Sequence, residues 1–304
     1  MMQMQNTLKK QVHFQGVGLH TGSQVTVTVK PALENHGIVF MRTDVEPSVR
    51  IPALSSYIVD TTLSTTIGKD GVTIATIEHL MAALWGLGVD NALVEVEGPE
   101  IPIMDGSSYP FVKQFKRRGL HKQSVHRKIF VVTEPISVID GDRYCYLLSQ
   151  KIPKLTCSID FAHPVIGKQK CEIKIDAKSF VTRLAKARTF GHLKDVEMLR
   201  QKGLIAGGSL DSAIVLDDQG VMNPEGLRYP DEFVRHKALD AFGDMALSGM
   251  RILGHLVTHK AGHELHYRLM RKLMTEKCGY VLDLTRQEQF QEELIPSFIQ
   301  PTIA

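Results

Sequence analysis

One segment constrains the fold more than any other: the run DEFVRHKALDAFGDMAL at residues 231–247. Its apolar residues recur at helical spacing and it stops near Gly249, so we predict an amphipathic helix. Residues four apart in a helix differ in direction by only about 40°. His236, Asp240 and Asp244 therefore form one polar stripe along an otherwise apolar helix. The buried surface around this stripe is marked by Phe233, Leu239, Phe242 and Met245.

The first two residues of the stripe have the spacing of a metal-binding pair. A histidine and an aspartate one turn apart can present an imidazole nitrogen and a carboxylate oxygen to one ion, which is the HxxxD version of the two-ligand helix in zinc hydrolases. The same spacing suits an ordinary ion pair on a helix surface. The spacing of His236 and Asp240 alone leaves both interpretations open.

A second candidate is the pair Glu78 and His79, at the start of an apolar helix expected over residues 76–87. Adjacent helical residues point about 100° apart, so the two side chains would not bind one ion side by side. One of them can be a ligand while the other faces the open coordination position, as a base beside metal-bound water. A solvent-facing Glu–His dipeptide is the alternative.

The histidine-rich segment at residues 254–266 (GHLVTHKAGHELH) is a competing metal site. On a strand, His255 and His259 would lie about 13 Å apart, too far to share an ion. His263 follows a glycine at a strand-to-helix turn and is better suited to be a freely pointing acid or base. An ordinary histidine at a helix N-terminus is the alternative.

Both halves of the chain repeat one order of elements, with strands first and then helix, strand, loop and helix. There is no residue-level repeat, so a duplicated α+β architecture follows from element order alone. We expect two domains, at residues 1–122 and 123–304. In the first half we expect short strands between residues 11 and 49, the clearest being the one in which Val25, Val27 and Val29 alternate with Thr26, Thr28 and Lys30, and further strands at 72–74 and 91–96. The other expected elements are strands at 129–132, 136–138, 144–148, 156–161 and 252–258, a helix at 109–118 and a basic helix from His263.

The expected domain boundary lies in a basic segment, residues 113–128, with seven lysines or arginines, two histidines and no acidic residue. A solvated linker is the simpler interpretation. The alternative is a patch that makes weak peripheral contact with an anionic membrane or binds phosphate. The sequence does not separate the two.

The composition excludes several classes of protein. Of the 304 residues, 43% are hydrophobic and 23% are charged, which is typical of soluble globular proteins. The net charge of +3 is too small to predict nucleic-acid binding. No stretch approaches a signal peptide or the ~20 apolar residues of a membrane span, and the four cysteines form no CxxC pair. We therefore expect a cytoplasmic protein whose metal, if any, is bound by histidines and carboxylates.

Eight motifs stand in order along nearly the whole chain: GVGLHTG (16–22), TIEHLMAAL (76–84), PEIPIMDGSS (99–108), IDFAHP (159–164), ARTFG (187–191), GLIAGGSLDSAIVLDD (203–218), EFVRHKALDAFGD (232–244) and HKAGHELH (259–266). Taken together, they resemble the UDP-3-O-acyl-N-acetylglucosamine deacetylase family. This family comprises zinc amidases that catalyse the committed step of lipid A synthesis in Gram-negative bacteria.

The resemblance implies two α+β domains, each a two-layer sandwich, with the active site between them and one zinc ion per chain. It implies these roles: His79, His236 and Asp240 as zinc ligands, Glu78 as general base, His263 as general acid, Asp244 as the residue that orients and charges it, and Thr189 as donor to the oxyanion. The implied substrate-binding residues are Lys237 near the phosphates, Phe161 and Lys260 at the nucleotide, and Phe190 at the start of an insert, residues 190–218, that lines the acyl-chain passage.

One position departs from the family pattern, because Ser64 stands where some members carry a cysteine close to the metal. We expect a weaker inhibitory effect of a second metal and no effect on catalysis. The resemblance further implies UDP-3-O-acyl-N-acetylglucosamine as substrate, a monomer, and no nucleic-acid partner. The remaining alternatives are a zinc amidohydrolase that acts on another N-acyl substrate and a non-catalytic binding module.

Overall fold

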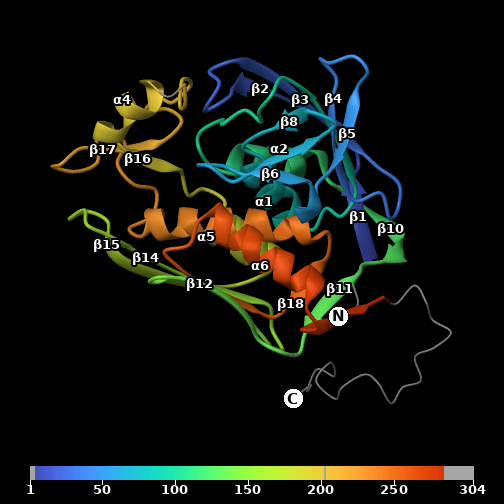
Figure 1. Ribbon diagram of the computed structural model, residues 1–304. Helices are drawn as coiled ribbons and strands as arrows, with labels where there is room; N and C mark the ends of the chain where they lie inside the picture. The colour runs from blue at the N-terminus through green and yellow to red at the C-terminus, as the bar shows by residue number, and fades with distance from the viewer. Residues whose placement is uncertain (1–3, 202, 284–304) are drawn as a thin grey trace.

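Two five-stranded sheets of the same topology lie on either side of a layer of helices (Figure 1). The computed structural model describes residues 4–201 and 203–283. In spatial order, the first sheet consists of β2 (Val12–Val17), β3 (Gln24–Pro31), β9 (Ala92–Glu97), β4 (Ile38–Arg42) and β5 (Val49–Pro52). The second consists of β12 (Ile136–Asp140), β13 (Arg143–Leu148), β19 (His255–His259), β14 (Lys154–Phe161) and β15 (Gly167–Lys174).

The two sheets repeat each other in detail. Numbered along the chain, the strands of each sheet stand in the order first, second, fifth, third, fourth. In each sheet the fifth and third strands are parallel, β9 with β4 and β19 with β14, and the other neighbours are antiparallel. The expected α+β class and its repeated element order are therefore confirmed.

Strand β3 shows why these segments form half-buried strands. Val25, Val27 and Val29 are buried and alternate with the more exposed Thr26 and Thr28. Successive side chains in a strand point to opposite faces, so the valines line the core face and the threonines the outer face. The predicted alternation is confirmed.

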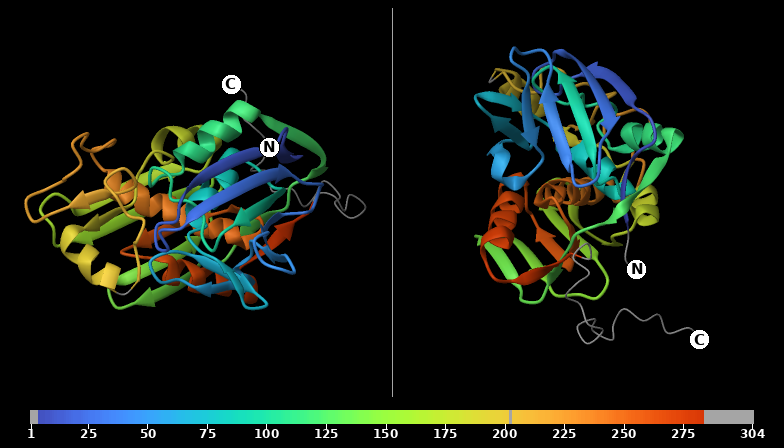
Figure 2. Two further views of the ribbon diagram at one scale, coloured as in Figure 1. Left: turned by 90° about the horizontal axis from the view of Figure 1, so that it is seen from above. Right: turned by 90° about the vertical axis from the view of Figure 1, so that its right-hand side faces the viewer.

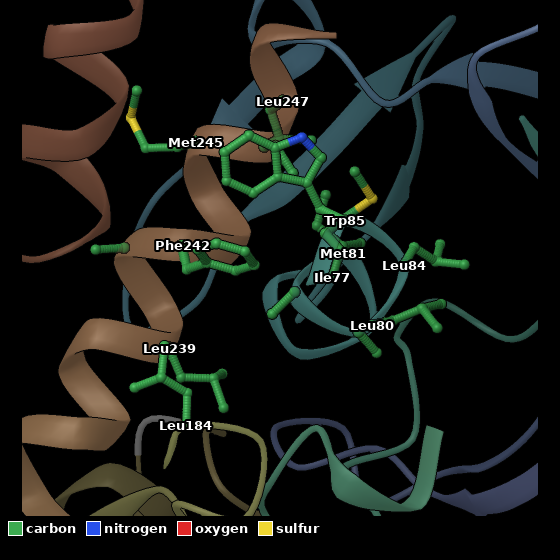
Figure 3. Packing of buried hydrophobic residues seen from close by; sticks show 14 of the residues in the cluster. Ile77, Leu80, Met81, Leu84, Trp85, Leu184, Leu239, Phe242, Met245 and Leu247 are labelled. Atoms are coloured by element: carbon green, nitrogen blue, oxygen red, sulfur yellow. The ribbon is translucent and has the colours of Figure 1, made fainter. Parts of the chain in front are cut away.

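Helices α1 (Glu78–Leu87) and α5 (Glu232–Met245) cross at the centre of the molecule, between the sheets (Figures 1 and 2). Nearly all residues of both helices are buried, as expected for helices covered on every side. Figure 3 shows Trp85 of α1 facing Phe242 of α5, with their ring centroids 4.6 Å apart. Helix α6 (His263–Thr275) packs against α5, β12 and β13.

Shorter elements complete the two halves. Strand β10 (Leu120–His126) pairs with β1 (Met4–Leu8), and residues 113–118 end a helix, so the basic segment, for which a solvated linker was the simpler interpretation, is largely regular structure. The predicted boundary between residues 122 and 123 falls inside β10 and stays a prediction. One three-stranded sheet consists of β6 (Ile58–Asp60), β7 (Thr66–Lys69) and β8 (Val72–Ile74), and another of β18 (Arg251–Leu253), β11 (Ile129–Val132) and β20 (Gly279–Leu282). The remaining elements are the helices α2 (Tyr109–Arg118) and α3 (Ala177–Arg183) and the 3₁₀ turns Ser55–Tyr57 and Ala246–Ser248.

The insert projects from one end of the molecule (Figure 1, yellow). It contains β16 (Phe190–His192), α4 (Leu193–Gln201) and β17 (Ile214–Leu216), and β16 pairs with β17. Leu193, Met198 and Leu210 are more than two-fifths exposed, which is a large apolar exposure for so short a segment.

Two predicted elements differ from the structure. Helix α1 begins at Glu78 rather than residue 76, because Thr76 has a left-handed φ of 56° and its hydroxyl is held by Glu100. The expected strand 252–258 is two strands, β18 and β19, which separate at Gly254 and belong to different sheets. A side chain at Gly254 would press on Val132 and on the backbone of Leu148, so glycine is needed where the chain passes from one sheet to the other. Within the described residues, no helix is both long and apolar enough to cross a membrane.

The crossing of α1 and α5 leads to a first prediction. A Cβ atom at Gly243 would overlap the backbone carbonyl of Glu78. In an unconstrained helix, glycine to alanine stabilises by ~1 kcal/mol. Here we expect Gly243→Ala to lower the free energy of unfolding by about 1–3 kcal/mol in denaturant titrations, because the helices must separate. Gly191→Ala, where the added atom meets nothing within 4 Å, is the control. A stabilised Gly243→Ala protein would contradict the tight crossing.

Candidate active site

Three buried side chains converge where α1 and α5 cross. His79 comes from α1, and His236 and Asp240 lie one turn apart on α5. One ligand atom from each lies within 4.8 Å of the others. The Nε2 atoms of His79 and His236 are 3.5 Å and 3.3 Å from Oδ1 of Asp240. The structure thus brings together the three predicted metal ligands.

The protonation of His236 shows that this cluster fits a cation. Its Nδ1 lies 3.2 Å from the backbone carbonyl of Ala187, which can only accept, so Nδ1 carries the hydrogen. Burial is the main reason that the pKa of His236 falls to about 3, so the ring is neutral and the lone pair of Nε2 faces Asp240. Oδ1 of Asp240 is buried without a hydrogen-bond partner among the described residues. Electron-rich atoms that face one another in a buried site form the donor set of a metal ion.

Glu78 stands beside the cluster, at the first turn of α1. It is buried, and one carboxylate oxygen accepts a hydrogen bond from the backbone N–H of Thr65 at 3.1 Å. Burial raises the pKa of Glu78, although the positive charge of His263 opposes the rise. A carboxyl group whose pKa is raised toward neutrality can accept a proton and pass it on.

Asp244 belongs to a second cluster, although it continues the stripe of His236 and Asp240. Its Oδ2 atom lies 2.8 Å from Nδ1 of His263, and its Oδ1 atom accepts from the hydroxyl of Thr65 at 2.6 Å. Burial alone would lower the pKa of His263, but the charge and hydrogen bond of Asp244 outweigh it and raise the pKa to about 9. The same pairing lowers the pKa of Asp244 despite its burial. His263 is therefore a fixed, charged group, not the freely pointing side chain that we expected.

Three of the predicted substrate-binding residues gather beside the metal ligands. The rings of Phe161, at the end of β14, and Phe190, at the start of β16, meet edge to face at 5.6 Å. The Nζ atom of Lys237 lies 5.5 Å from the ring centroid of Phe190 and 3.0 Å from Oδ2 of Asp240. Aromatic faces and an ammonium group at one place suit a ring with an attached anion.

The other two predicted residues are placed by their backbones. The N–H of Thr189 donates to the carbonyl of Gly106 at 2.8 Å, so Thr189 is tied to the loop between β9 and α2. The N–H of Lys260 donates to Ser158 on β14 at 2.9 Å, while its side chain pairs with Asp142 at 2.5 Å. Their roles toward the oxyanion and the nucleotide stay predictions.

Sequence reasoning missed two residues of the second cluster. Thr65 is buried and contacts both Glu78 and Asp244, as described above. His266 is buried on α6, and its Nδ1 atom lies 2.7 Å from Oδ2 of Asp244. The spacing of His263 and His266, three residues apart on one helix, was the available signal. Ser64, adjacent to Thr65, is also buried.

The fold and this site are typical of a metal-dependent hydrolase, with an open ligand set between a carboxyl group and a charged histidine. A family model described as UDP-3-O-acyl N-acetylglycosamine deacetylase matches residues 5–275. The chain belongs to this family. UDP-3-O-acyl-N-acetylglucosamine deacetylases of Myxococcus xanthus and Geobacter sp. are similar to it, at 48% identity (94% of this chain, 91% of the relative) and 46% identity (92% of each). The enzyme of Geotalea uraniireducens is 46% identical over 94% of each chain.

The geometry of the first cluster leads to a prediction about metal content. His79→Ala, His236→Ala and Asp240→Ala each remove one of three ligand atoms, so we expect metal affinity to fall by at least about 10²-fold. Elemental analysis after dialysis against a weak chelator measures this. His255→Ala, on β19 outside the cluster, should retain the metal of the unaltered protein. Tight binding by any of the three variants would remove that residue from the ligand set.

Proposed function

We propose that the chain binds one zinc ion through His79, His236 and Asp240 and hydrolyses an acetamide beside it. The observation that carries the proposal is the buried oxygen of Asp240, which faces two imidazole nitrogens and has no hydrogen-bond partner among the described residues. Two imidazoles and one carboxylate form a three-ligand set of the kind that catalytic zinc uses, with a fourth position open. When bound, zinc would polarise a carbonyl group and lower the pKa of water to about 7.

The substrate follows from the family. The chain is an N-deacetylase of lipid A biosynthesis, and its substrate is an acylated UDP-sugar. We assign UDP-3-O-acyl-N-acetylglucosamine, with the phosphates near Lys237 and the nucleotide near Phe161 and Lys260. The meeting of Phe161, Phe190 and Lys237 beside His236 supports this orientation. The exposed apolar residues of the insert support an acyl-chain passage there.

The protein's own residues supply the proton transfers. Glu78 accepts a proton from water as the water oxygen bonds to the acetamide carbon, and the hydroxyl of Thr189 donates to the developing oxyanion. His263 then delivers a proton to the glucosamine nitrogen as the C–N bond breaks, because an amide anion would not leave. Asp244 binds Nδ1 of His263, which leaves Nε2 for the substrate. The products are acetate and the free amine.

We also infer that the enzyme acts as a cytoplasmic monomer, with the site between domains at residues 1–122 and 123–304. The ligand-bearing helices, the base and the acid come from one chain, so the proposed site needs no residue from a second copy. The four cysteines are free and buried, which suits a reducing compartment.

Replacing the base tests the proposed reaction. Glu78→Gln keeps the size of the side chain but cannot accept a proton. We expect unchanged zinc content and a kcat for UDP-3-O-acyl-N-acetylglucosamine that is lower by ~10²–10⁴. Acetate release is measured on metal-stripped protein with and without one equivalent of Zn²⁺. Loss of zinc in the variant would make Glu78 a ligand, and faster hydrolysis of simpler N-acyl compounds would favour another amidohydrolase activity.

The ion pair of His263 predicts the basic side of the pH profile. The imidazolium holds its proton below its pKa of about 9 and loses it above that pH. A bound cation would lower this pKa, so kcat/KM should decline at or below about pH 9, by tenfold per pH unit. His263→Gln should lower the rate and alter this decline. An unchanged rate and profile would mean that another group protonates the leaving amine.

A further inference from the structure

Asp244 holds two histidines on one oxygen. The Nδ1 atoms of His263 and His266 lie 2.8 Å and 2.7 Å from its Oδ2 atom, and the hydroxyl of Thr65 occupies Oδ1. An ionised carboxylate only accepts hydrogen bonds, so both Nδ1 atoms carry hydrogen. Asp244 therefore divides its negative charge among three donors.

His266 differs from His263 in what it can reach. Its side chain is only 1% exposed, and its Nε2 atom has no hydrogen-bond partner in the described part of the chain. The side chain of His263 is 9% exposed, and its Nδ1 atom also lies 3.2 Å from the hydroxyl of Thr65. Among the described residues, Asp244 is thus the hydrogen-bond partner of the His266 ring, and no hydrogen bond joins His266 to Glu78. An electrostatic effect of His266 on the reaction therefore acts through Asp244.

We propose that His266 is a positioning residue, which fixes the carboxylate of Asp244 and weakens its ion pair with His263. The inference rests on the proposed role of His263 as general acid. A carboxylate that accepts an additional hydrogen bond is less basic, so it holds a neighbouring imidazolium less strongly. A general acid must give up its proton, so an ion pair that is too strong would slow the proton transfer.

Other charged groups also act on His263 and must stay constant in a test. These are Glu78 at the start of α1, Asp240 on α5, and His20 in the loop between β2 and β3, which in turn interacts with Asp60. None of them contacts His266 through a hydrogen bond in the described structure. Substitutions at His266 can therefore change the Asp244 pair while these groups remain.

Two substitutions separate the hydrogen bond from the packing of the ring. His266→Leu removes the donor and fills most of the volume. His266→Asn keeps an N–H group near the place of Nδ1, so it is the conservative variant. His255→Asn is the matched control, because His255 lies on β19 and bonds to Thr156 rather than to Asp244. Zinc content and the emission of the single tryptophan, Trp85, at the crossing of α1 and α5, report whether each variant folds.

The experiment follows the titration of His263 by NMR in the metal-free protein and the basic side of kcat/KM in the zinc-loaded enzyme. For His266→Leu we expect the titration midpoint of His263 and the pH at which kcat/KM declines each to rise by about 0.5–1 pH unit. We expect kcat to be lower by about three- to tenfold and KM to be unchanged. His266→Asn should restore most of the original behaviour, and His255→Asn should leave it unchanged.

The outcomes distinguish this inference from the proposed function. An unmoved titration in His266→Leu would overturn the inference, as would a His266→Asn protein that shifts as far as His266→Leu. If His266→Leu does not fold, His266→Met, which also removes the donor, takes its place, and an unmoved titration in that variant overturns the inference. A shift by NMR without a shift in kcat/KM would support the inference and overturn the acid role of His263.

Discussion

The contact between α1 and α5 is the constraint on which the rest of the site depends. Gly243 lets the backbone of α5 approach the carbonyl of Glu78, at the residue that precedes the ligand His79. This approach brings an imidazole from the first half of the chain within 3.5 Å of a carboxylate from the second. Two sheets of equal topology cover the crossing from both sides, so the helices cannot separate without exposing the core. The fold thus fixes ligands that are about 160 residues apart in sequence, as the numbers of His79 and Asp240 show.

The neighbours of α5 then divide its stripe into two sites with different chemistry. His236, Asp240 and Asp244 share one face of α5, yet the first two turn to His79 and the third turns to α6. Near His79 no hydrogen-bond donor satisfies Oδ1 of Asp240 within the described residues, so that site suits a cation. Asp244 accepts hydrogen bonds from Thr65, His263 and His266, and its negative charge stabilises the protonated form of His263. One helix therefore serves metal binding and proton donation, because its neighbours differ.

The sequence predicted this arrangement where local rules decide it, and failed where tertiary contacts decide it. The spacing of His236 and Asp240, the alternation of β3 and the helix Tyr109–Arg118 depend on local periodicity, and all three are as expected. The pairing of β10 with β1 depends on residues more than a hundred positions apart, so neither interpretation of the basic segment, as a linker or as a surface patch, included a paired strand. Thr65 and His266 carry no motif of their own. They matter because the fold places both against Asp244.

Thr65 joins the two sides of the reaction. Its backbone N–H binds Glu78, and its hydroxyl binds Asp244, which holds His263. Burial favours the neutral form of both groups: it raises the pKa of Glu78 and would lower the pKa of His263, but the ion pair with Asp244 keeps His263 charged. A base that can take up a proton and an acid that retains one thus coexist within one network. Thr65, just before β7, therefore links the base at the start of α1 to the acid at the start of α6 through two hydrogen bonds and the carboxylate of Asp244.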